Sequence, residues 1–310
     1  MLTVATAKLL FIAGNVAMIG FSLVWALATR WAGFLRLAFA VVLLELGVYV
    51  YAFHVEPNWL QVRHVEIDDA ALAKICRGLT IVQISDLHVD EVGRRERQLP
   101  DMVNQLHPDM VLITGDFISS IVGVKGVKAL VSQLKAPMGV WGVLGNTDHI
   151  FVDGDALTKE LEAAGMQILT NEAQYVRTEG GGFYLVGVDD PVMGHDRLER
   201  AWVDVPVGMP SILLAHGPDI ITKPLARRAS LVLAGHTHGG QLGVPIVRQL
   251  SDYADRSPYM AGRFHVDDTQ LYVNQGIGMK TRMFRFLCRP EITVFQFRAP
   301  VRLPVKRAIR

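Results

Sequence analysis

Two histidines separated by one residue follow a short apolar run near the end of the chain. His236 and His238 lie in Gly235-His236-Thr237-His238-Gly239-Gly240, directly after the run 231–234. A short apolar run that ends in glycine is typical of a buried strand opening into a loop. Imidazole is the commonest metal ligand in proteins, and the glycines leave space around the pair. Taken alone, the pair fits metal binding and ordinary loop histidines equally well.

Four other apolar runs also end in residues that bind metals. The expected strands 79–84, 110–114, 139–144 and 211–215 are followed by Asp86 and His88, by Asp116, by Asn146 and by His216. In an α/β sheet, ligands gather at the carboxyl ends of the strands. Each residue alone could cap a helix or form a turn, but five strand ends with such residues indicate one site.

The chemistry of these side chains indicates the kind of metal. Carboxylate, imidazole and amide oxygen together suit Mn, Fe or Zn. Seven ligands are too many for one ion and fit two. Two ions about 3.5–4 Å apart hold a phosphoryl group between them and lower the pKa of a bridging water toward about 7. The pattern therefore predicts a dinuclear centre for phosphoryl chemistry.

The remaining pattern alternates helices with strands. Further strands are expected at 183–188, 271–273 and 292–297, and helices at 94–107, 124–135, 155–165 and 218–229, with Pro100 and Pro218 in first turns.

In this order, the residues resemble the calcineurin-like metallophosphoesterases. That family has Asp-x-His, Gly-Asp, Gly-Asn-His-Asp/Glu, His and Gly-His-x-His, and this chain has matching residues at 86–88, 115–116, 145–148, 216 and 235–238. The longer Gly-His-Thr-His-Gly-Gly-Gln, 235–241, is similar to the branch with amino-terminal membrane segments. The resemblance covers 62–297 and implies a two-sheet α/β sandwich flanked by helices. It implies two divalent metal ions, one held by Asp86, His88 and His238, the other by Asn146, His216 and His236, with Asp116 bridging both.

One position departs from the family signature. Thr147 stands where the family has the histidine that assists the leaving group. A hydroxyl is a much weaker proton donor, and general acid catalysis typically contributes about 10²–10⁴-fold. His149 and His195, the latter in a loop after the expected strand 183–188, are candidate catalytic substitutes beside Asp116 and Asn146. The alternative is that both are ordinary surface histidines.

The beginning of the chain is typical of a membrane segment. Residues 9–29 carry no charge, and at about 1.5 Å per residue they are about as long as a bilayer core is thick. The second apolar run, 37–53, contains Glu45, whose charge costs at least about 2.5 kcal/mol at mid-depth. We expect a transmembrane helical hairpin in 1–57, the catalytic domain in 58–298 and a basic tail in 299–310. The alternative is a buried helix pair of a soluble domain.

The membrane orientation stays open at this stage. Arg30 and Arg36 between the two runs favour a cytoplasmic turn, whereas Lys8 and Arg63 favour the opposite orientation. The net charge of +1 argues against wholesale nucleic-acid binding. Cys76 and Cys288 form neither a disulfide framework nor a metal-ligand pattern.

Together these observations predict a membrane-anchored, dinuclear metal-dependent phosphohydrolase, with the bacterial inner membrane as its expected location. The expected partners are the lipid bilayer and a phosphorylated lipid or nucleotide-linked substrate; nucleic acid is not expected, and the oligomeric state is open. By resemblance, a candidate activity is that of the UDP-2,3-diacylglucosamine pyrophosphatase of lipid A synthesis. The alternatives are a general phosphodiesterase of the cell envelope, a nuclease of the same superfamily, and a catalytically impaired metal-binding membrane protein.

Overall fold

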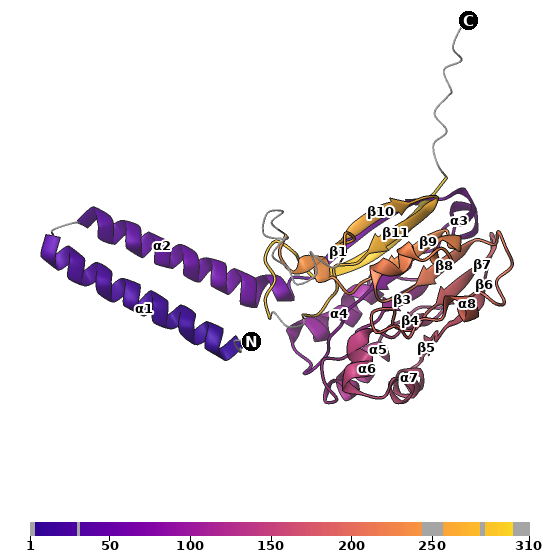
Figure 1. Ribbon diagram of the computed structural model, residues 1–310, viewed down its shortest axis with the longest axis horizontal. Coiled ribbons are helices and arrows are strands. Elements are labelled where there is room, and N and C mark those ends of the chain that lie inside the picture. Colours follow the sequence, from indigo (N-terminus) through magenta and orange to yellow (C-terminus); the bar gives the residue numbers. More distant parts are fainter. Residues whose placement is uncertain (1–3, 30–31, 244–256, 280–282, 300–310) are drawn as a thin grey trace, which may run out of the picture.

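Two six-stranded sheets form the body of the protein, and a helical hairpin projects from one end of it (Figure 1). The computed structural model describes residues 4–29, 32–243, 257–279 and 283–299. The order of the first sheet is β1 (Gln61–Asp68), β12 (Glu291–Arg298), β2 (Ile81–Ile84), β3 (Met110–Thr114), β4 (Val140–Val143) and β5 (Met166–Ile168). The order of the second sheet is β10 (Gly262–Val266), β11 (Thr269–Val273), β9 (Leu231–Ala234), β8 (Ser211–Leu214), β7 (Gly181–Gly187) and β6 (Glu172–Thr178).

The strands that precede the candidate ligands are central and parallel to their neighbours. In the first sheet β2, β3, β4 and β5 are parallel, and in the second β11, β9, β8 and β7 are parallel. Strands buried on both faces read as continuous apolar runs, and every residue of β2, β3, β4, β8 and β9 is buried. Parallel order brings the carboxyl ends of the central strands of each sheet to one edge.

Three layers of apolar side chains hold the sandwich together. The middle layer joins the inner faces of the two sheets, through residues such as Met110, Leu112, Leu185 and Leu231. One outer layer lies between the first sheet and the helices α4 (Arg94–Asn104), α5 (Gly123–Val131) and α7 (Gly154–Ala163). The other covers the second sheet beneath α8 (Leu198–Ala201) and neighbouring turns. The short helices α3 (Ala70–Ile75) and α6 (Asn146–Phe151) complete the domain. The predicted two-sheet α/β sandwich is confirmed.

Several local predictions need correction. The helix expected at 218–229 is two 3₁₀ turns, η3 (Pro218–Thr222) and η4 (Ala226–Arg228). Pro224 lies between them, where it removes a backbone donor and disfavours helix at the preceding residue. Pro100 lies inside α4, not in its first turn. Strands β1, β5, β6 and β10 were not foreseen, whereas the helices expected at 94–107, 124–135 and 155–165 are present as α4, α5 and α7.

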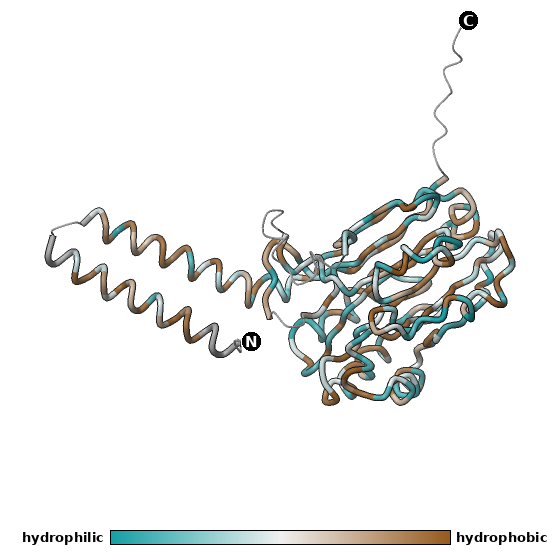
Figure 2. Tube along the Cα trace, in the orientation of Figure 1, coloured by the Kyte–Doolittle hydropathy of each residue, from teal (hydrophilic) through white to brown (hydrophobic). Residues whose placement is uncertain are grey.

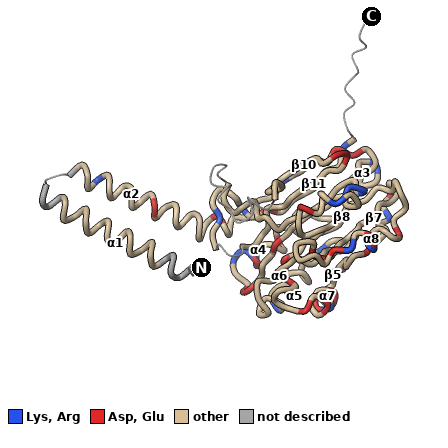
Figure 3. Tube along the Cα trace, in the orientation of Figure 1, with Lys and Arg blue, Asp and Glu red and all other residues tan. Residues whose placement is uncertain are grey.

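The hairpin consists of α1 (Val4–Thr29) and α2 (Ala32–Val50), and α2 continues into a π turn, η1 (Tyr51–Val55), and a 3₁₀ turn, η2 (Glu56–Asn58). Most of its described residues are hydrophobic (Figure 2). Leu9, Val24 and Leu44 are 67%, 68% and 68% exposed. Among the described side chains of α1 and α2, Arg36 and Glu45 carry the only charges of Lys, Arg, Asp or Glu (Figure 3). No part of the described domain covers these exposed apolar side chains, and a continuous apolar surface of this kind is suited to contact with lipid hydrocarbon.

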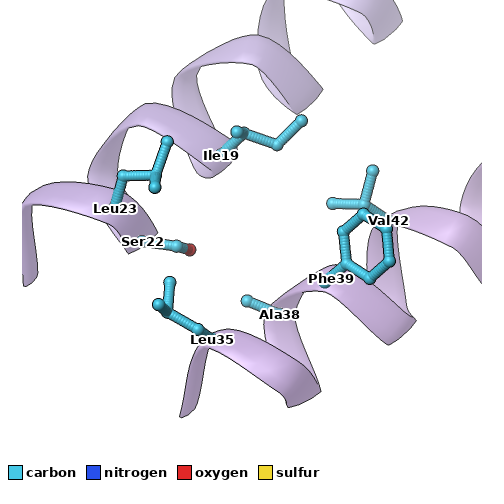
Figure 4. Close-up of a pocket in the computed structure, with 7 residues that line it drawn as sticks. All are labelled: Ile19, Ser22, Leu23, Leu35, Ala38, Phe39 and Val42. Atoms are coloured by element: carbon cyan, nitrogen blue, oxygen red, sulfur yellow. The ribbon is translucent and has the colours of Figure 1, made fainter. Parts of the chain in front are cut away.

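Only one helix among the described residues, 33–58, is long and apolar enough to cross a membrane; Leu9–Trp25 is a shorter apolar helix. The second apolar helix is longer than the expected run 37–53, because η1 and η2 extend α2. Between the helices lies an apolar gap of about 240 Å³, into which Ile19, Leu23 and Phe39 point (Figure 4). Its one polar side chain, Ser22, donates a hydrogen bond to the Met18 carbonyl at 2.7 Å. Arg30 and the expected tail, apart from Ala299, lie outside the described residues.

The end of the hairpin is bonded to the catalytic domain. The Ala52 carbonyl accepts a hydrogen bond from the backbone N–H of Arg285 at 3.0 Å. The Glu56 carboxylate is fully buried and accepts hydrogen bonds from the backbone N–H groups of Leu287, at 2.7 Å, and Cys288. The expected boundary between 57 and 58 stays a prediction, but Glu56 packs with the catalytic domain.

Candidate metal centre

The candidate ligands converge where the two sheets meet. Asp86 and His88 follow β2, Asp116 follows β3 and Asn146 follows β4, all in the first sheet, whereas His216 follows β8 and the pair His236 and His238 follows β9, in the second. The five strand ends therefore belong to two sheets. The first sheet contributes four of the candidate ligands to the site and the second contributes three.

Asp86, His88 and His238 form the first group. The Nε2 atoms of His88 and His238 are 3.0 Å apart, and His238 Nε2 is 3.4 Å from Asp86 Oδ1. One potential ligand atom from each residue lies within 4.8 Å of the others, and all three side chains are buried. The arrangement has the spacing of a metal-ligating group and excludes competing water.

Asp116, His216 and His236 form the second group. His216 Nε2 is 3.3 Å from Asp116 Oδ2 and 3.1 Å from His236 Nδ1. His216 Nδ1 donates a hydrogen bond to the Thr114 carbonyl at 2.8 Å, which directs the lone pair of Nε2 into the site.

Asp116 lies between the two groups. Its Oδ2 atom is 3.3 Å from Nε2 of His88 in the first group and 3.3 Å from Nε2 of His216 in the second. Its Oδ1 atom accepts the backbone N–H of Thr147 at 2.8 Å, which fixes the rotamer of the carboxylate. A carboxylate held in this position is suited to bridge two cations.

Asn146 provides the clearest test of whether the site fits metal ions. It begins α6, is 6% exposed, and its Oδ1 atom has no hydrogen-bond partner among the described residues. A buried acceptor left without a partner costs about 1–3 kcal/mol. A divalent cation would satisfy this oxygen, and the full set of carboxylate, imidazole and amide donors fits such ions. The roles of the seven ligands stay predictions.

The backbone at the site is strained. Asp86, His88, Asp116, His236 and His238 have φ values of 50°, 44°, 54°, 70° and 51°, in the left-handed region that costs about 1–3 kcal/mol for residues other than glycine. Gly235 is also constrained, because a Cβ atom there would lie 1.9 Å from Ser85 Oγ and 2.3 Å from Asp86 Oδ2. Such strain clusters at functional sites, and apart from the glycines no residue pattern predicted it.

Buried charges shift the pKa values of the site. Burial, followed by the neighbouring Asp116, raises the pKa of Asp86 to about 6. Burial and Asp116 also raise the pKa of Asp148 to about 7. Burial alone would lower the pKa of His216, but the charge and hydrogen bond of Asp116 outweigh it and raise that pKa to about 10. A centre so crowded with carboxylates favours bound cations, which reverse this repulsion.

Asp148 is a structural residue to which sequence reasoning assigned no role. Its Oδ1 accepts the backbone N–H groups of Phe117, at 2.8 Å, and Ile118, at 3.2 Å, and its Oδ2 accepts that of Gly145 at 2.9 Å. It thereby ties the loop after β3 to the loop after β4. Its place three residues after the glycine of a strand–helix turn is a capping-box spacing that could have identified it.

Arg285 was also missed. Its side chain is fully buried, and Nη2 donates to the carbonyls of Gln275, Gly276 and Gly278 at 3.0, 3.1 and 2.7 Å. The same nitrogen is 3.5 Å from His238 Nδ1. No local sequence pattern marks this residue, because its partners depend on the fold.

The two candidate proton donors form a third cluster, with Asp189. His149 Nε2 is 2.7 Å from Asp189 Oδ1, and His195 Nδ1 is 4.0 Å from Asp189 Oδ2. The hydrogen bond to Asp189 raises the pKa of His149, although burial opposes it. His149 follows Asn146 by three residues on α6, a spacing that places both on one face of the helix. Asp189 lies two residues after the end of β7, so the rule that identified the other ligands would have found it.

Thr147 cannot take over the missing acid. The residue is fully buried, and its hydroxyl has no hydrogen-bond partner among the described residues. Only its backbone N–H contacts the candidate centre, through Asp116.

Known proteins resemble this chain in sequence. Residues 79–240 match the family model of the calcineurin-like phosphoesterases. Metallophosphoesterase YkuE of Bacillus subtilis (strain 168) is 31% identical over 260 residues, covering 82% of this chain and 91% of the relative. A transmembrane protein with metallophosphoesterase domain from Danio rerio is 34% identical over 267 residues, covering 80% of this chain and 59% of the relative. The UDP-2,3-diacylglucosamine pyrophosphatase LpxG of Chlamydia muridarum (strain MoPn / Nigg) is 26% identical over 322 residues, covering 83% and 95%.

Proposed function

Because this chain belongs to the calcineurin-like phosphoesterase family and is a hydrolase of phosphoric ester bonds, we propose that it acts from a membrane on a lipid-linked or nucleotide-linked substrate. The bond cleaved is a phosphodiester or a pyrophosphate. The observation that carries the proposal is the position of Asp116, whose Oδ2 is 3.3 Å from one histidine of each ligand group.

In this proposal, Asp86, His88 and His238 hold one divalent ion, Asn146, His216 and His236 hold the other, and Asp116 contacts both. When bound, such a pair polarises a phosphoryl group and lowers the pKa of a shared water. The chain itself keeps the ligands in place, through the Thr114 carbonyl on His216 and the Thr147 N–H on Asp116. Mn, Fe and Zn all suit these donors.

Leaving-group protonation distinguishes the possible substrates. With Thr147 buried, the cluster of His149, Asp189 and His195 is the proposed source of a proton. If neither histidine reaches the substrate, the rate depends on how well the departing oxygen carries charge. A phosphate monoester, with a second pKa of about 6, leaves far better than an alkoxide, whose hydroxyl resembles water with its pKa of about 15.7. The site then favours pyrophosphate bonds over alkyl phosphodiesters.

The hairpin supports a membrane location, for which we propose the bacterial inner membrane. Its apolar side chains are exposed, and the helix 33–58 is long enough to cross. A diacylated nucleotide sugar, the substrate in the name of the Chlamydia relative, combines a pyrophosphate bond with a lipid anchor. We propose this substrate class, with a general phosphodiesterase of the cell envelope as the second candidate.

The test uses the full-length protein in detergent micelles with Mn²⁺. Three substrates are compared: UDP-2,3-diacylglucosamine, its deacylated counterpart, and the soluble alkyl diester glycerophosphoethanolamine, whose alkoxide leaving group needs a proton. The proposal expects the diacylated pyrophosphate to have the highest kcat/KM. Faster hydrolysis of diesters would support the general phosphodiesterase, and bound metal without turnover of any substrate would show an impaired enzyme.

Asp116→Asn provides the matching control for the metal centre. The amide removes the negative charge between the ligand groups, so activity and metal content should fall together. Full activity with two metal ions per chain would contradict the bridging role.

A further inference from the structure

An apolar groove lies at the junction between the hairpin and the catalytic domain. On the hairpin side it is lined by residues that include Phe11, Val48 and Tyr49, and on the domain side by Leu242, Phe284 and Phe286. Its volume is about 450 Å³, within the range of about 300–1,000 Å³ typical of ligand pockets. Glu45 is its one charged lining residue. We call this site the junction groove.

The domain side of the junction groove is part of the metal-binding framework. The backbone N–H of Phe286 donates to the Gln241 carbonyl at 3.0 Å, and that of Gly243 donates to the Phe286 carbonyl at 2.8 Å. Leu242 is therefore held beside Phe286. It follows His238 by four residues, so the two Cα atoms are at most about 14 Å apart. The wall of the groove and a candidate metal ligand share one short, hydrogen-bonded segment.

The segment from Phe284 to Phe286 also connects the hairpin to the centre. Between the two phenylalanines, the backbone N–H of Arg285 is bonded to the Ala52 carbonyl, and its side chain reaches within 3.5 Å of His238 Nδ1. The groove is thus fixed to the metal site by the same residues that fix the hairpin to the domain.

The hairpin wall indicates what fills the groove. Leu44, which lines it, is 68% exposed, and the adjacent Leu46 and Val50 are 49% and 43% exposed. In the proposed membrane location these side chains contact lipid hydrocarbon. The lining of the groove extends this apolar surface from α2 to Leu242, in the segment that follows His238. Glu45 is the one charged residue in that lining. A water-soluble ligand has few partners in such a lining.

We propose that the junction groove binds an acyl chain of the substrate, so that the phosphate-bearing head group is presented to the metal centre from the bilayer. This inference rests on the proposed function, because it assumes a lipid-linked substrate. It assigns substrate selection to the join between hairpin and domain, and it makes the hairpin a part of the binding site as well as an anchor.

Two matched substitutions on α2 test the acyl-chain site. Val48→Trp places a large side chain in the junction groove. Val42→Trp makes the same change in the separate gap of Figure 4, about 1.7 turns nearer the hairpin turn, or about 9 Å along the helix. Both variants are studied as full-length protein in nanodiscs.

The first measurement is photocrosslinking with a phosphatidic acid that carries a diazirine in one acyl chain. In the wild type and in Val42→Trp, the peptide containing Phe284 and Phe286 should be labelled. In Val48→Trp its labelling should fall at least about tenfold, the effect of withdrawing roughly two methylene groups from contact. An unlabelled peptide in the wild type, or equal labelling in both variants, would overturn the proposal. If Val48→Trp fails to fold, an unlabelled peptide in the wild type still overturns the proposal.

The second measurement is kcat/KM for the diacylated and deacylated substrates. Val48→Trp should lower kcat/KM about tenfold for the diacylated compound alone, whereas Val42→Trp should change neither. Equal losses on both compounds would refute an acyl-chain site while leaving the phosphohydrolase intact. Wild-type turnover of bis(4-nitrophenyl) phosphate reports on the proposed function separately.

Discussion

Glu56→Gln tests whether the join between hairpin and domain supports the metal site. The buried carboxylate of Glu56 accepts two backbone N–H groups, from Leu287 and Cys288. A glutamine amide keeps one acceptor oxygen and places an NH₂ group against the other N–H. Hydrogen bonds to a charged group contribute about 1.5–3 kcal/mol, and an unsatisfied buried donor costs about 1–3 kcal/mol. The recovered desolvation of the carboxylate offsets part of this loss. We therefore expect a destabilisation of about 1–3 kcal/mol.

The control is Glu66→Gln. Glu66 is about half exposed and forms a surface ion pair with Arg298 at 2.8 Å, a contact that contributes roughly 0–1 kcal/mol. The assay is the urea concentration at half-loss of bound Mn²⁺ for full-length protein in micelles. Loss of the Glu56 contact should reach the metal, because Cys288 Sγ is 3.4 Å from the His238 carbonyl. Equal midpoints for the two variants would refute the reasoning.

Three other predictions follow from the same geometry. Asp189→Asn should lower the pKa of His149 toward its ordinary value, because the hydrogen bond to Asp189 is the largest cause of its rise. A histidine whose pKa is raised in the folded state stabilises the fold fully below about pH 6.5, and this stabilisation is lost as the pH rises through the raised pKa. Asp189→Asn should therefore lower the free energy of unfolding at pH 6 and not at pH 10. Urea titrations at both pH values would check this. Thr147→Val should leave activity within about twofold, since the hydroxyl is buried and has no partner among the described residues; a loss of about 10²-fold would identify it as a catalytic group. Deleting 1–50 should release the domain from membranes with its metal, whereas deleting 1–57 also removes Glu56 and should lower metal retention, as fractionation and metal analysis would show.

The ligand-bearing strands were predictable because their signal is local. Each is a short apolar run followed within two or three residues by Asp, Asn or His, and burial on both faces makes that run continuous. The order of these motifs in turn implied the two-sheet fold. Edge strands such as β6 mix exposed and buried positions, so no comparable pattern marked them.

The supporting residues were not predictable in this way. Glu56 meets its partners 231 and 232 positions away, and Arg285 binds carbonyls of a loop without a sequence motif. Their burial comes from tertiary packing, which composition and periodicity do not encode. The helix expected at 218–229 is absent for a different reason, because Pro224 interrupts the helical pattern between the two 3₁₀ turns.

The left-handed backbone at the candidate centre restricts which residue types can serve as ligands there, and therefore which metals the site can bind. Among residues other than glycine, Asp, Asn and His are several-fold enriched at positive φ, and the five left-handed ligand positions hold only Asp and His. A change to cysteine, to recruit softer metals, would have to overcome the backbone preference as well as the new coordination chemistry. The loop conformation thus favours residue types that supply nitrogen and oxygen ligands at these positions. It makes a thiolate centre difficult to reach by single substitutions.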